Sequence, residues 1–199
     1  QYQQRIFTIL QLRLHPSIKA LKERYPENPG QQMHDIDLTY ITSRGNWYFA
    51  SWKADNTKAG GIATNIGIHF FDMLTWIFGD VQSNTVHVNE PKRASGFLQL
   101  RHARIRWYLS VDENALPEAI RQKGQRTFRS ITVDGEEVEF SGGFTDLHTE
   151  SYKQILAGQG FTVQDAAQSI NTVYNIRRAE PKGLKGDYHP FAKKPVEYH

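Results

Sequence analysis

Hydrophobic and polar residues alternate along several short segments of this chain, which is the pattern of β-strands. In residues 35–42, Ile36, Leu38 and Tyr40 share one face, so this segment predicts a half-buried strand. The pair Asp134-Gly135 stands between two further segments and predicts a hairpin turn. The same pattern predicts strands at 5–14, which is apolar on both faces, and at 35–42, 81–88, 95–100, 105–111, 126–133 and 137–140.

Apolar residues recur every three or four positions in other segments, as in helices that pack against a sheet. Helices are expected at 17–25, 60–78, 147–156 and 163–178, with Pro16 ending the strand before the first and Asp146 capping the third. Residues 27–30 should end the first helix, and 181–199 show no period, which predicts an irregular surface arm. The predicted fold is α+β: an open, largely antiparallel β-sheet with helices packed on one face.

The helix predicted at 60–78 is apolar around nearly its whole circumference, so it belongs inside the protein. Asn65, His69 and Asp72 are spaced four and then three apart, which brings their side chains onto one face. Burying such a polar stripe is costly unless the groups bond one another or a ligand, and the spacing favours a ligand. Gly67 indicates a close approach to another segment or a ligand, and Gly60-Gly61 leaves amide groups free at the helix start.

A histidine can take a proton from a hydroxyl near neutral pH, and a carboxylate one turn away can orient its ring. His69 and Asp72 are placed for these two roles. Metal binding is the rival use of the same residue types, but a metal site needs about three convergent donors and this stripe holds one histidine. No metal site is therefore expected.

Composition excludes several classes of function. The chain has 199 residues and no cysteine, which removes disulfides, thiolate catalysis and cysteine-based zinc sites. No run approaches the roughly 18 to 20 apolar residues of a membrane span, and the N-terminal residues lack the apolar stretch of a signal peptide, so we expect a soluble, cytoplasmic protein with no membrane partner. The 24 basic and 21 acidic residues nearly balance, which argues against a nucleic-acid partner. The basic clusters at 101–106 and 121–129 could attract a phosphate-bearing small molecule.

Residues 60–72, Gly-Gly-Ile-Ala-Thr-Asn-Ile-Gly-Ile-His-Phe-Phe-Asp, resemble the D-x-G-x-H-x-x-D signature of the glucose-fructose oxidoreductase and inositol dehydrogenase (Gfo/Idh/MocA) family. The resemblance implies the C-terminal domain of that fold, NAD as cofactor and a homo-oligomer, either a dimer or a tetramer. It places His69 at the catalytic position, with Asp72 and Asn65 beside it. Asn65 stands where most members have aspartate, which keeps a hydrogen-bonding group but removes a negative charge.

Residues 10–16, 42–45, 47–48, 51–53 and 184–191 resemble one branch of that family. It oxidises the C3 hydroxyl of a UDP-N-acetylaminosugar uronate for the O-antigen of lipopolysaccharide, and recycles NADH with 2-oxoglutarate. The resemblance therefore implies both molecules as partners. Candidate substrate-binding residues are Arg13, Ser43, Arg44, Tyr48, Lys53, Thr64, Asn65 and His69, since arginine and lysine suit carboxylate and diphosphate groups. Trp47 and Trp52 could stack on uracil or sugar, although packing in the core is the first expectation.

Neither a G-x-G-x-x-G fingerprint nor the family's Glu-Lys-Pro segment occurs in the sequence. We therefore expect residues 1–14 to be the end of a nucleotide-binding domain and its crossing strand, 15–180 to form a domain for substrate binding and oligomerisation, and 181–199 to form the C-terminal arm. The chain by itself should then show no dehydrogenase activity, since NAD would be held mainly by the missing N-terminal domain.

Two alternatives stay open: the same family acting on another sugar or polyol, and a non-catalytic binding or assembly module. A nucleic-acid role is a weaker hypothesis. An oligomer would be expected to bury apolar residues on the sheet face away from the helices, such as those in 81–88 and 105–111.

Overall fold

One six-stranded sheet organises the chain, with strands in the order β3-β4-β5-β2-β6-β7. The computed structural model describes residues 6–25, 32–54, 56–138 and 144–194. Its sheet consists of β2 (His34–Thr42), β3 (Val81–Asn89), β4 (Arg93–Leu100), β5 (Ala103–Ser110), β6 (Thr127–Val133) and β7 (Glu136–Glu137). Neighbouring strands are antiparallel except for β2 and β5, which are parallel. The largely antiparallel sheet predicted from the alternation is confirmed.

The hairpin at Asp134-Gly135 is also confirmed. Both residues have positive φ, 54° and 85°, as a two-residue turn that follows the twist of the strands requires. The turn pairs Val133 of β6 with Glu136 of β7. Residues 139 and 140 of the last predicted strand lie outside the described residues.

The strand predicted at 5–14 is wrong for most of its length. β1 (Phe7–Thr8) forms a separate two-stranded sheet with β8 (Phe161–Thr162), and Gln11–Leu14 form the 3-10 turn η1. A segment that is apolar on both sides has no period that separates a strand from another buried conformation. Here a tight turn buries Leu12, and His15 then starts the next helix by accepting the backbone N–H of Ser17.

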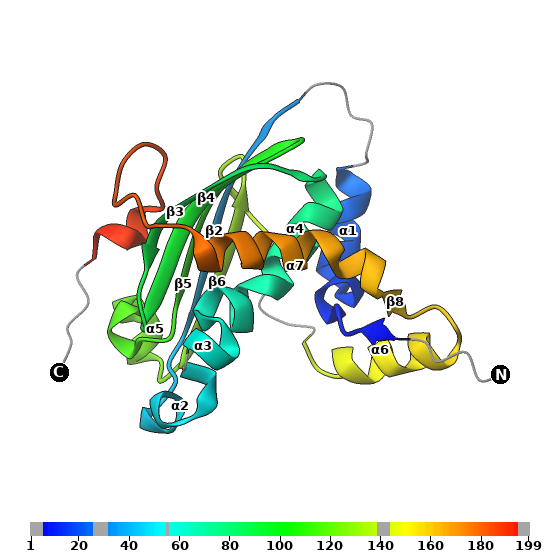
Figure 1. Cartoon of the computed structure of the whole chain (residues 1–199), viewed down its shortest axis with the longest axis horizontal. Helices are drawn as coiled ribbons and strands as arrows, with labels where there is room; N and C mark the ends of the chain where they lie inside the picture. The colour runs from blue at the N-terminus through cyan, green and yellow to red at the C-terminus, as the bar shows by residue number, and fades with distance from the viewer. Residues whose placement is uncertain (1–5, 26–31, 55, 139–143, 195–199) are drawn as a thin grey trace.

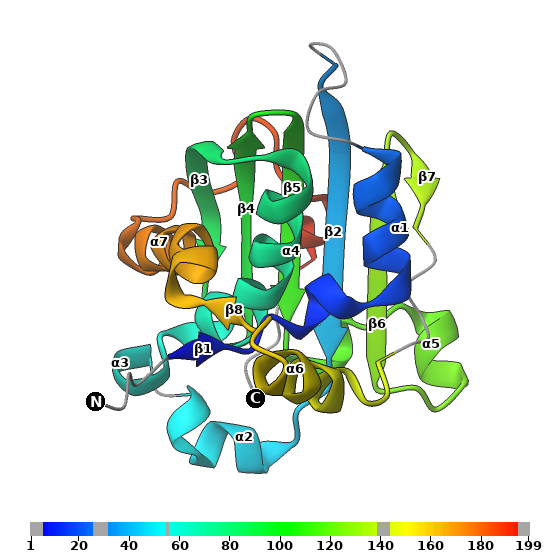
Figure 2. The ribbon, with the colours of Figure 1, turned by 90° about the vertical axis from the view of Figure 1, so that its right-hand side faces the viewer.

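The four predicted helices are confirmed, and three of them cover the same face of the sheet. Figures 1 and 2 show α1 (Pro16–Arg24), α4 (Ile68–Phe78) and α7 (Val163–Arg178) together on this face, with α6 (Leu147–Leu156) below them. The π-helical turn η3 (Ala63–Gly67) leads into α4, and the remaining helical segments are α2 (Asn46–Ala50), η2 (Trp52–Ala54), α3 (Asn56–Ala59), η4 (Glu113–Ala115), α5 (Glu118–Gln122) and η5 (Pro190–Lys193). The predicted helix stop at 27–30 lies outside the described residues.

Capping by Asp146 is wrong. Asp146 does precede α6, but its backbone is left-handed (φ 64°) and its side chain makes no capping hydrogen bond. In that conformation the carboxylate cannot turn back onto the first free N–H groups of the helix. The capping box lies instead at the start of α7, where the side chains of Thr162 and Asp165 each bond the other's backbone N–H.

Helix α4 lies in the core, as its composition predicts. Phe71, Met73 and Leu74 are fully buried there, and Phe71 meets the ring of Trp107 on β5 edge-on, with centroids 5.3 Å apart. A Cβ added at Gly67 would lie 2.8 Å from Leu109 of β5, which is closer than carbon atoms approach. The close contact expected at Gly67 is therefore with the sheet, and it sets how near the start of α4 lies to β5.

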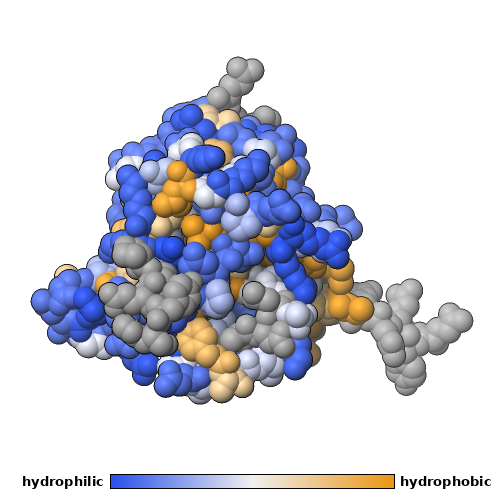
Figure 3. All heavy atoms as spheres, turned by 60° about the vertical axis from the view of Figure 1, so that its left-hand side comes forward, coloured by the Kyte–Doolittle hydropathy of each residue, from blue (hydrophilic) through white to orange (hydrophobic). Residues whose placement is uncertain are grey.

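The sheet face away from the helices does not carry the exposed apolar patch that an oligomer was expected to bury. Arg104 and Arg106 of β5 instead make two-pronged ion pairs with Asp35 and Asp37 of the parallel strand β2. The apolar side chains of this face are covered by the C-terminal arm. Phe191 and Ala192 of the arm pack in a cluster with Ile41, Val88, Tyr108, Ala115 and Leu116. Figure 3 shows this side as mostly hydrophilic, with smaller apolar patches between.

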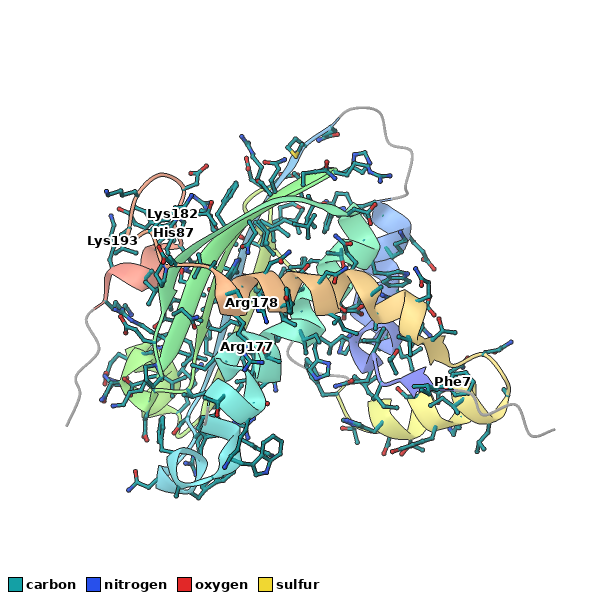
Figure 4. All side chains as sticks on the ribbon, in the orientation of Figure 1. Phe7, His87, Arg177, Arg178, Lys182 and Lys193 are labelled. Carbon is teal, nitrogen blue, oxygen red and sulfur yellow. The ribbon has the colours of Figure 1, made fainter. Side chains whose placement is uncertain are left out.

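The described part of the predicted arm, residues 181–194, is irregular apart from η5 and runs from the edge strand β3 across the outer face of the sheet to β5 and β2. The backbone N–H of Lys182 donates to the carbonyl of Val86 on β3, 2.9 Å away. Figure 4 shows Lys182 and Lys193 near His87, at the opposite end of the molecule from Phe7.

His189 fastens the arm to the sheet. Its imidazole is 3% exposed and stacks on Tyr108, with ring centroids 5.8 Å apart. Nδ1 accepts the N–H of Phe191 at 3.2 Å, which leaves Nε2 to donate to the hydroxyl of Thr39 at 3.0 Å. Burial lowers the pKa of His189 to about 4, with Asp37 opposing the shift and Arg106 adding to it.

This pKa predicts how the free energy of unfolding depends on pH. The unfolded chain takes up the proton first as pH falls, so the contribution of neutral His189 is complete above about pH 6.5 and is lost as pH drops from there through about 4. We expect His189→Gln to flatten this slope in urea unfolding experiments at several pH values. His148→Gln, which changes an exposed histidine, should keep the slope. Identical slopes for His189→Gln and the unmodified chain would contradict the prediction.

Candidate functional site

A cavity lies against the first turn of α4. Its volume of about 550 Å³ is within the usual size range of small-molecule sites. Its walls come from η1, the ends of β2 and β6, η2, η3, α4 and α6. The lining side chains are Gln11, Leu12, Tyr40, Arg44, Lys53, Asn65, Ile66, His69, Phe70, Arg129, Phe144 and His148. Three of these are cationic and none is a carboxylate, so the cavity favours an anionic ligand.

Local backbone geometry presents Asn65 and His69 to this cavity. Gly60 and Gly61 have φ of 74° and 78°, a left-handed turn that admits glycine without strain, and the helical residues begin at Gly61. The π-helical turn η3 is wider than an α-helical turn, a feature that is frequent at functional sites. The Asn65 amide donates to the carbonyl of Lys53 at 2.9 Å, which ties η2 to the helix beside the cavity.

His69 has the chemistry of a proton acceptor. Its Nδ1 is buried and has no hydrogen-bond partner among the described residues. Burial lowers the pKa of His69 below its ordinary 6.5, with Asp72 opposing the shift and His148 adding to it. The imidazole is therefore neutral at pH 7, and its partly exposed ring lines the cavity, where it can accept a proton from a ligand hydroxyl.

Two further lining residues have unsatisfied polar atoms. Gln11 Oε1 and Arg44 Nε are both buried without a hydrogen-bond partner in the described part of the chain. Buried polar groups are almost always paired in folded proteins. Together with His69 Nδ1 they are three buried polar atoms beside one cavity, and burial of unpaired polar atoms carries a cost in stability.

Asp72 lies away from the cavity and is bound to Arg13. Arg13 Nε and Nη2 donate to the two carboxylate oxygens at 2.8 and 2.7 Å, and the two side chains are 8% and 2% exposed. Arg13 Nη2 also donates to the carbonyl of Asp165 at the start of α7, at 2.9 Å. Neither Arg13 nor Asp72 lines the cavity, and the described hydrogen bonds of the Asp72 carboxylate go to Arg13 and not to His69.

The structure brings together some of the predicted site residues and not others. Arg44, Lys53, Asn65 and His69 line one cavity. Ser43 donates instead to the Glu113 carboxylate at 3.2 Å, and Thr64 to the carbonyl of Gly60 at 2.8 Å. Tyr48 is 4% exposed and outside the lining, and burial raises its pKa.

Three polar residues of the cavity were not among the predicted site residues. Gln11, Arg129 and His148 come from η1, β6 and α6, which are far apart along the chain. Gln11 lies within the segment 10–16 and Arg129 within the basic cluster 121–129, but no spacing along the chain distinguishes either one. Arg129 lies opposite Tyr40 in the pairing of β2 with β6, a relation between segments far apart that the sequence alone does not show.

The core positions expected for Trp47 and Trp52 are wrong. They are 55% and 58% exposed, because α2 and η2 lie at the periphery of the fold (Figure 2), where Tyr48 is the residue of α2 that is buried in the core. The Lys53 ammonium lies 6.0 Å from the centroid of the Trp47 ring. Two exposed indole rings therefore stand on the segment that also supplies Arg44 and Lys53 to the cavity.

Of the two basic clusters noted in the sequence, the one at 101–106 is neutralised by acidic partners, whereas the one at 121–129 is paired only at its first residue within the described chain. Arg101, Arg104 and Arg106 pair with carboxylates, and so does Arg121. In the described ranges, no group of three or more histidine, aspartate and glutamate residues is placed to hold a metal ion. None of the helices described here is long and apolar enough to cross a membrane.

Comparison with known proteins identifies the fold. The pattern of the oxidoreductase family's C-terminal alpha/beta domain (Gfo/Idh/MocA) matches residues 32–168. The chain is also similar to the WlbA (WbpB) dehydrogenase of Thermus thermophilus, solved with NAD and UDP-GlcNAcA, at 50% identity and a TM-score of 0.88 over 94% of this chain and 60% of that one. A second structure of that dehydrogenase, with NAD and alpha-ketoglutarate, matches at 52% identity with the same coverage and TM-score.

A more distant similarity shows the fold alone. The WlbA dehydrogenase of Bordetella pertussis, solved with NADH and UDP-GlcNAcA, is 18% identical with a TM-score of 0.64, over 87% of this chain and 61% of that one. The chain thus spans about three fifths of the length of the solved structures that it matches.

The buried pair Arg13–Asp72 leads to a prediction about stability. Removing one partner strands the other charge, which costs roughly 3 to 5 kcal/mol, whereas removing both leaves no uncompensated charge. In urea unfolding, Arg13→Met and Asp72→Leu should each destabilise strongly, and the double variant by far less than their sum. The exposed pair Arg101–Asp80, treated in the same way, should show a coupling of about 1 kcal/mol or less. Additive losses for Arg13 and Asp72 would contradict the prediction.

Proposed function

The chain belongs to the Gfo/Idh/MocA oxidoreductase family, as its C-terminal alpha/beta domain, and on that premise we propose that it forms the sugar-binding part of an NAD-dependent dehydrogenase. The proposed reaction is oxidation of the C3 hydroxyl of a UDP-N-acetylaminosugar uronate. The observation that carries the proposal is His69, neutral and partly exposed, in a cavity with three cationic side chains and no carboxylate.

The charge of the cavity supports a substrate of this class. A nucleoside diphosphate and a uronate are both anions, and Arg44, Lys53 and Arg129 can supply donors to them. A neutral polyol would leave these cations without partners inside the cavity. The charge thus favours the UDP-uronate over the alternative substrate, another sugar or polyol, and the similar Thermus thermophilus protein was solved with UDP-GlcNAcA.

In the proposed mechanism His69 takes the proton of the sugar hydroxyl as that carbon is oxidised. A neutral imidazole with a lowered pKa is suited to this step, because it is unprotonated when the substrate arrives. NAD, when bound, accepts the hydride. Asn65, one turn before His69, keeps its amide on the Lys53 carbonyl and so holds η2 as one wall of the sugar site.

The segment 47–53 supports a place for the nucleotide. Trp47 and Trp52 are exposed near the cavity, and an aromatic ring that stacks on a base contributes about 1 to 3 kcal/mol. Arg44 and Lys53 line the cavity together with His69, and their cationic groups are suited to bind a diphosphate. We accordingly assign the uracil to the tryptophans and the sugar to His69.

The wider role follows from the same proposal. We propose that a nucleotide-binding domain outside this sequence holds most of the NAD, since the sequence lacks the glycine-rich fingerprint that binds dinucleotide phosphates. The chain alone should then show no turnover. Recycling of NADH by 2-oxoglutarate, a role in lipopolysaccharide O-antigen synthesis, a cytoplasmic location and a dimer or tetramer remain predictions, of which sedimentation would test the last.

The catalytic role of His69 can be tested on the chain joined to a nucleotide-binding domain of the family. We expect this protein to reduce NAD with the UDP-uronate and His69→Asn to abolish turnover. His102→Asn, which changes a histidine outside the cavity, should retain it. Because the pKa of His69 is lowered, the acid limb of kcat/KM should lie below pH 6.5. Equal turnover in His69→Asn would refute the role, and no turnover in any joined protein would favour a non-catalytic module.

The stacking role of the tryptophans predicts a selective loss of affinity. Trp47→Ala and Trp52→Ala should each weaken binding of the UDP-uronate by calorimetry, by up to about 3 kcal/mol. Binding of 2-oxoglutarate, which has no base, should stay the same. Equal weakening of both ligands would show that the indoles support the fold of α2 and do not contact the base.

A further inference from the structure

Arg129 differs from most arginines of the described chain because no carboxylate holds it. Seven arginines of the described residues are ion-paired, at Arg13–Asp72, Arg24–Glu136, Arg93–Glu90, Arg101–Asp80, Arg104–Asp35, Arg106–Asp37 and Arg121–Glu118. Arg129 has neither an ion pair nor a side-chain hydrogen bond within the described residues, although it is only partly exposed and lines the cavity.

Aromatic rings hold the guanidinium of Arg129 in place. Its central carbon lies 4.3 Å from the ring centroid of Phe144 and 5.4 Å from that of Tyr40. Tyr40 is the direct neighbour of Arg129 across the antiparallel pair β2–β6, so the pairing register fixes this contact. A guanidinium held by ring faces keeps its N–H groups, which point outward in its plane, free to bind a planar anion with two hydrogen bonds.

The same group of aromatic side chains connects Arg129 to the start of α4, where His69 lies. The rings of Tyr40 and Phe70 are 5.0 Å apart, and Phe70 directly follows His69 at the start of α4. Arg129 and His69 are therefore presented from two walls of one cavity, β6 on one side and α4 on the other. Arg44 and Lys53 belong to a third part of the lining, the segment that carries the exposed tryptophans.

From this arrangement we infer that Arg129 is the residue that binds the substrate carboxylate and so selects acids over neutral sugars. The inference rests on the proposed function and adds a specificity residue to it. On a hexuronate, the carboxylate stands on C5 and the reacting hydroxyl on C3, two carbons away around the ring. One sugar ring can then place its acid on Arg129 and its hydroxyl at His69, with the diphosphate toward Arg44 and Lys53.

The carboxylate could belong to the sugar or to a free 2-oxo acid, and the two are separated by using both as probes. Calorimetry on the chain would compare UDP-N-acetylglucosaminuronate with UDP-N-acetylglucosamine, which differ only in whether C6 is a carboxylate, and 2-oxoglutarate would be measured separately. A hydrogen-bonded ion pair of this kind corresponds to about a 10- to 100-fold preference for the acid. Arg129→Gln should abolish this preference and leave affinity for the neutral UDP-sugar unchanged.

Arg126→Gln is the matched control, because Arg126 lies three residues before Arg129, outside the cavity, and its loss should leave the preference intact. If Arg129→Gln does not fold by circular dichroism, Phe144→Leu tests the same inference by removing the ring that holds the guanidinium, and should reduce the preference.

A preference retained in the folded variant would overturn the role of Arg129 and leave the proposed function standing. Loss of only 2-oxoglutarate binding would overturn the assignment to the sugar. Failure of the unmodified chain to bind either UDP-sugar would instead overturn the proposed function and the inference with it.

Discussion

The buried ion pair between Arg13 and Asp72 connects the parts of the chain that form the cavity. Arg13 belongs to η1, Asp72 to α4, and the same guanidinium reaches the first turn of α7 through the carbonyl of Asp165. Two charges buried at this depth tolerate little displacement, since each depends on the other for the solvation that it has lost. Gln11 precedes Arg13 by two residues, and His69 precedes Asp72 by three. The ion pair thereby holds Gln11 and His69 in the walls of one cavity.

Much of the fold could be predicted from local patterns. Strand alternation, the Asp134-Gly135 turn and the amphipathic stripe of residues 163–178 each depend on neighbours within a few positions, and the structure agrees with them. The segment 5–14 failed because its apolar residues on both sides fit a tight turn as well as a strand. The apolar outer face expected of the sheet failed because the acids that oppose Arg104 and Arg106 lie 69 positions away along the chain.

The residues of the candidate site also fall into those that local sequence patterns predict and those that depend on contacts between distant segments. Asn65 and His69 could be found from helical spacing, and Arg44 and Lys53 from the chemistry of their side chains in segments that resemble a known family. The partner of Arg13 could not, because an arginine has the same pattern in sequence whether it meets a ligand or an aspartate 59 positions away. Arg129 was missed for the complementary reason: its isolation from acids is a property of the assembled fold, which no neighbouring residue encodes.

The parallel seam between β2 and β5 has a consequence for how the chain reaches this structure. Its pairs join residues 69 positions apart, whereas β3, β4 and β5 are linked to one another by short turns. The intervening chain includes α4, so closing the seam requires ordering a long loop before any pairing energy is gained. Folding should therefore begin with the β3–β4–β5 meander and be limited in rate by the docking of β2, with the ladder of Asp35, Asp37, Arg104 and Arg106 formed only once that docking is complete.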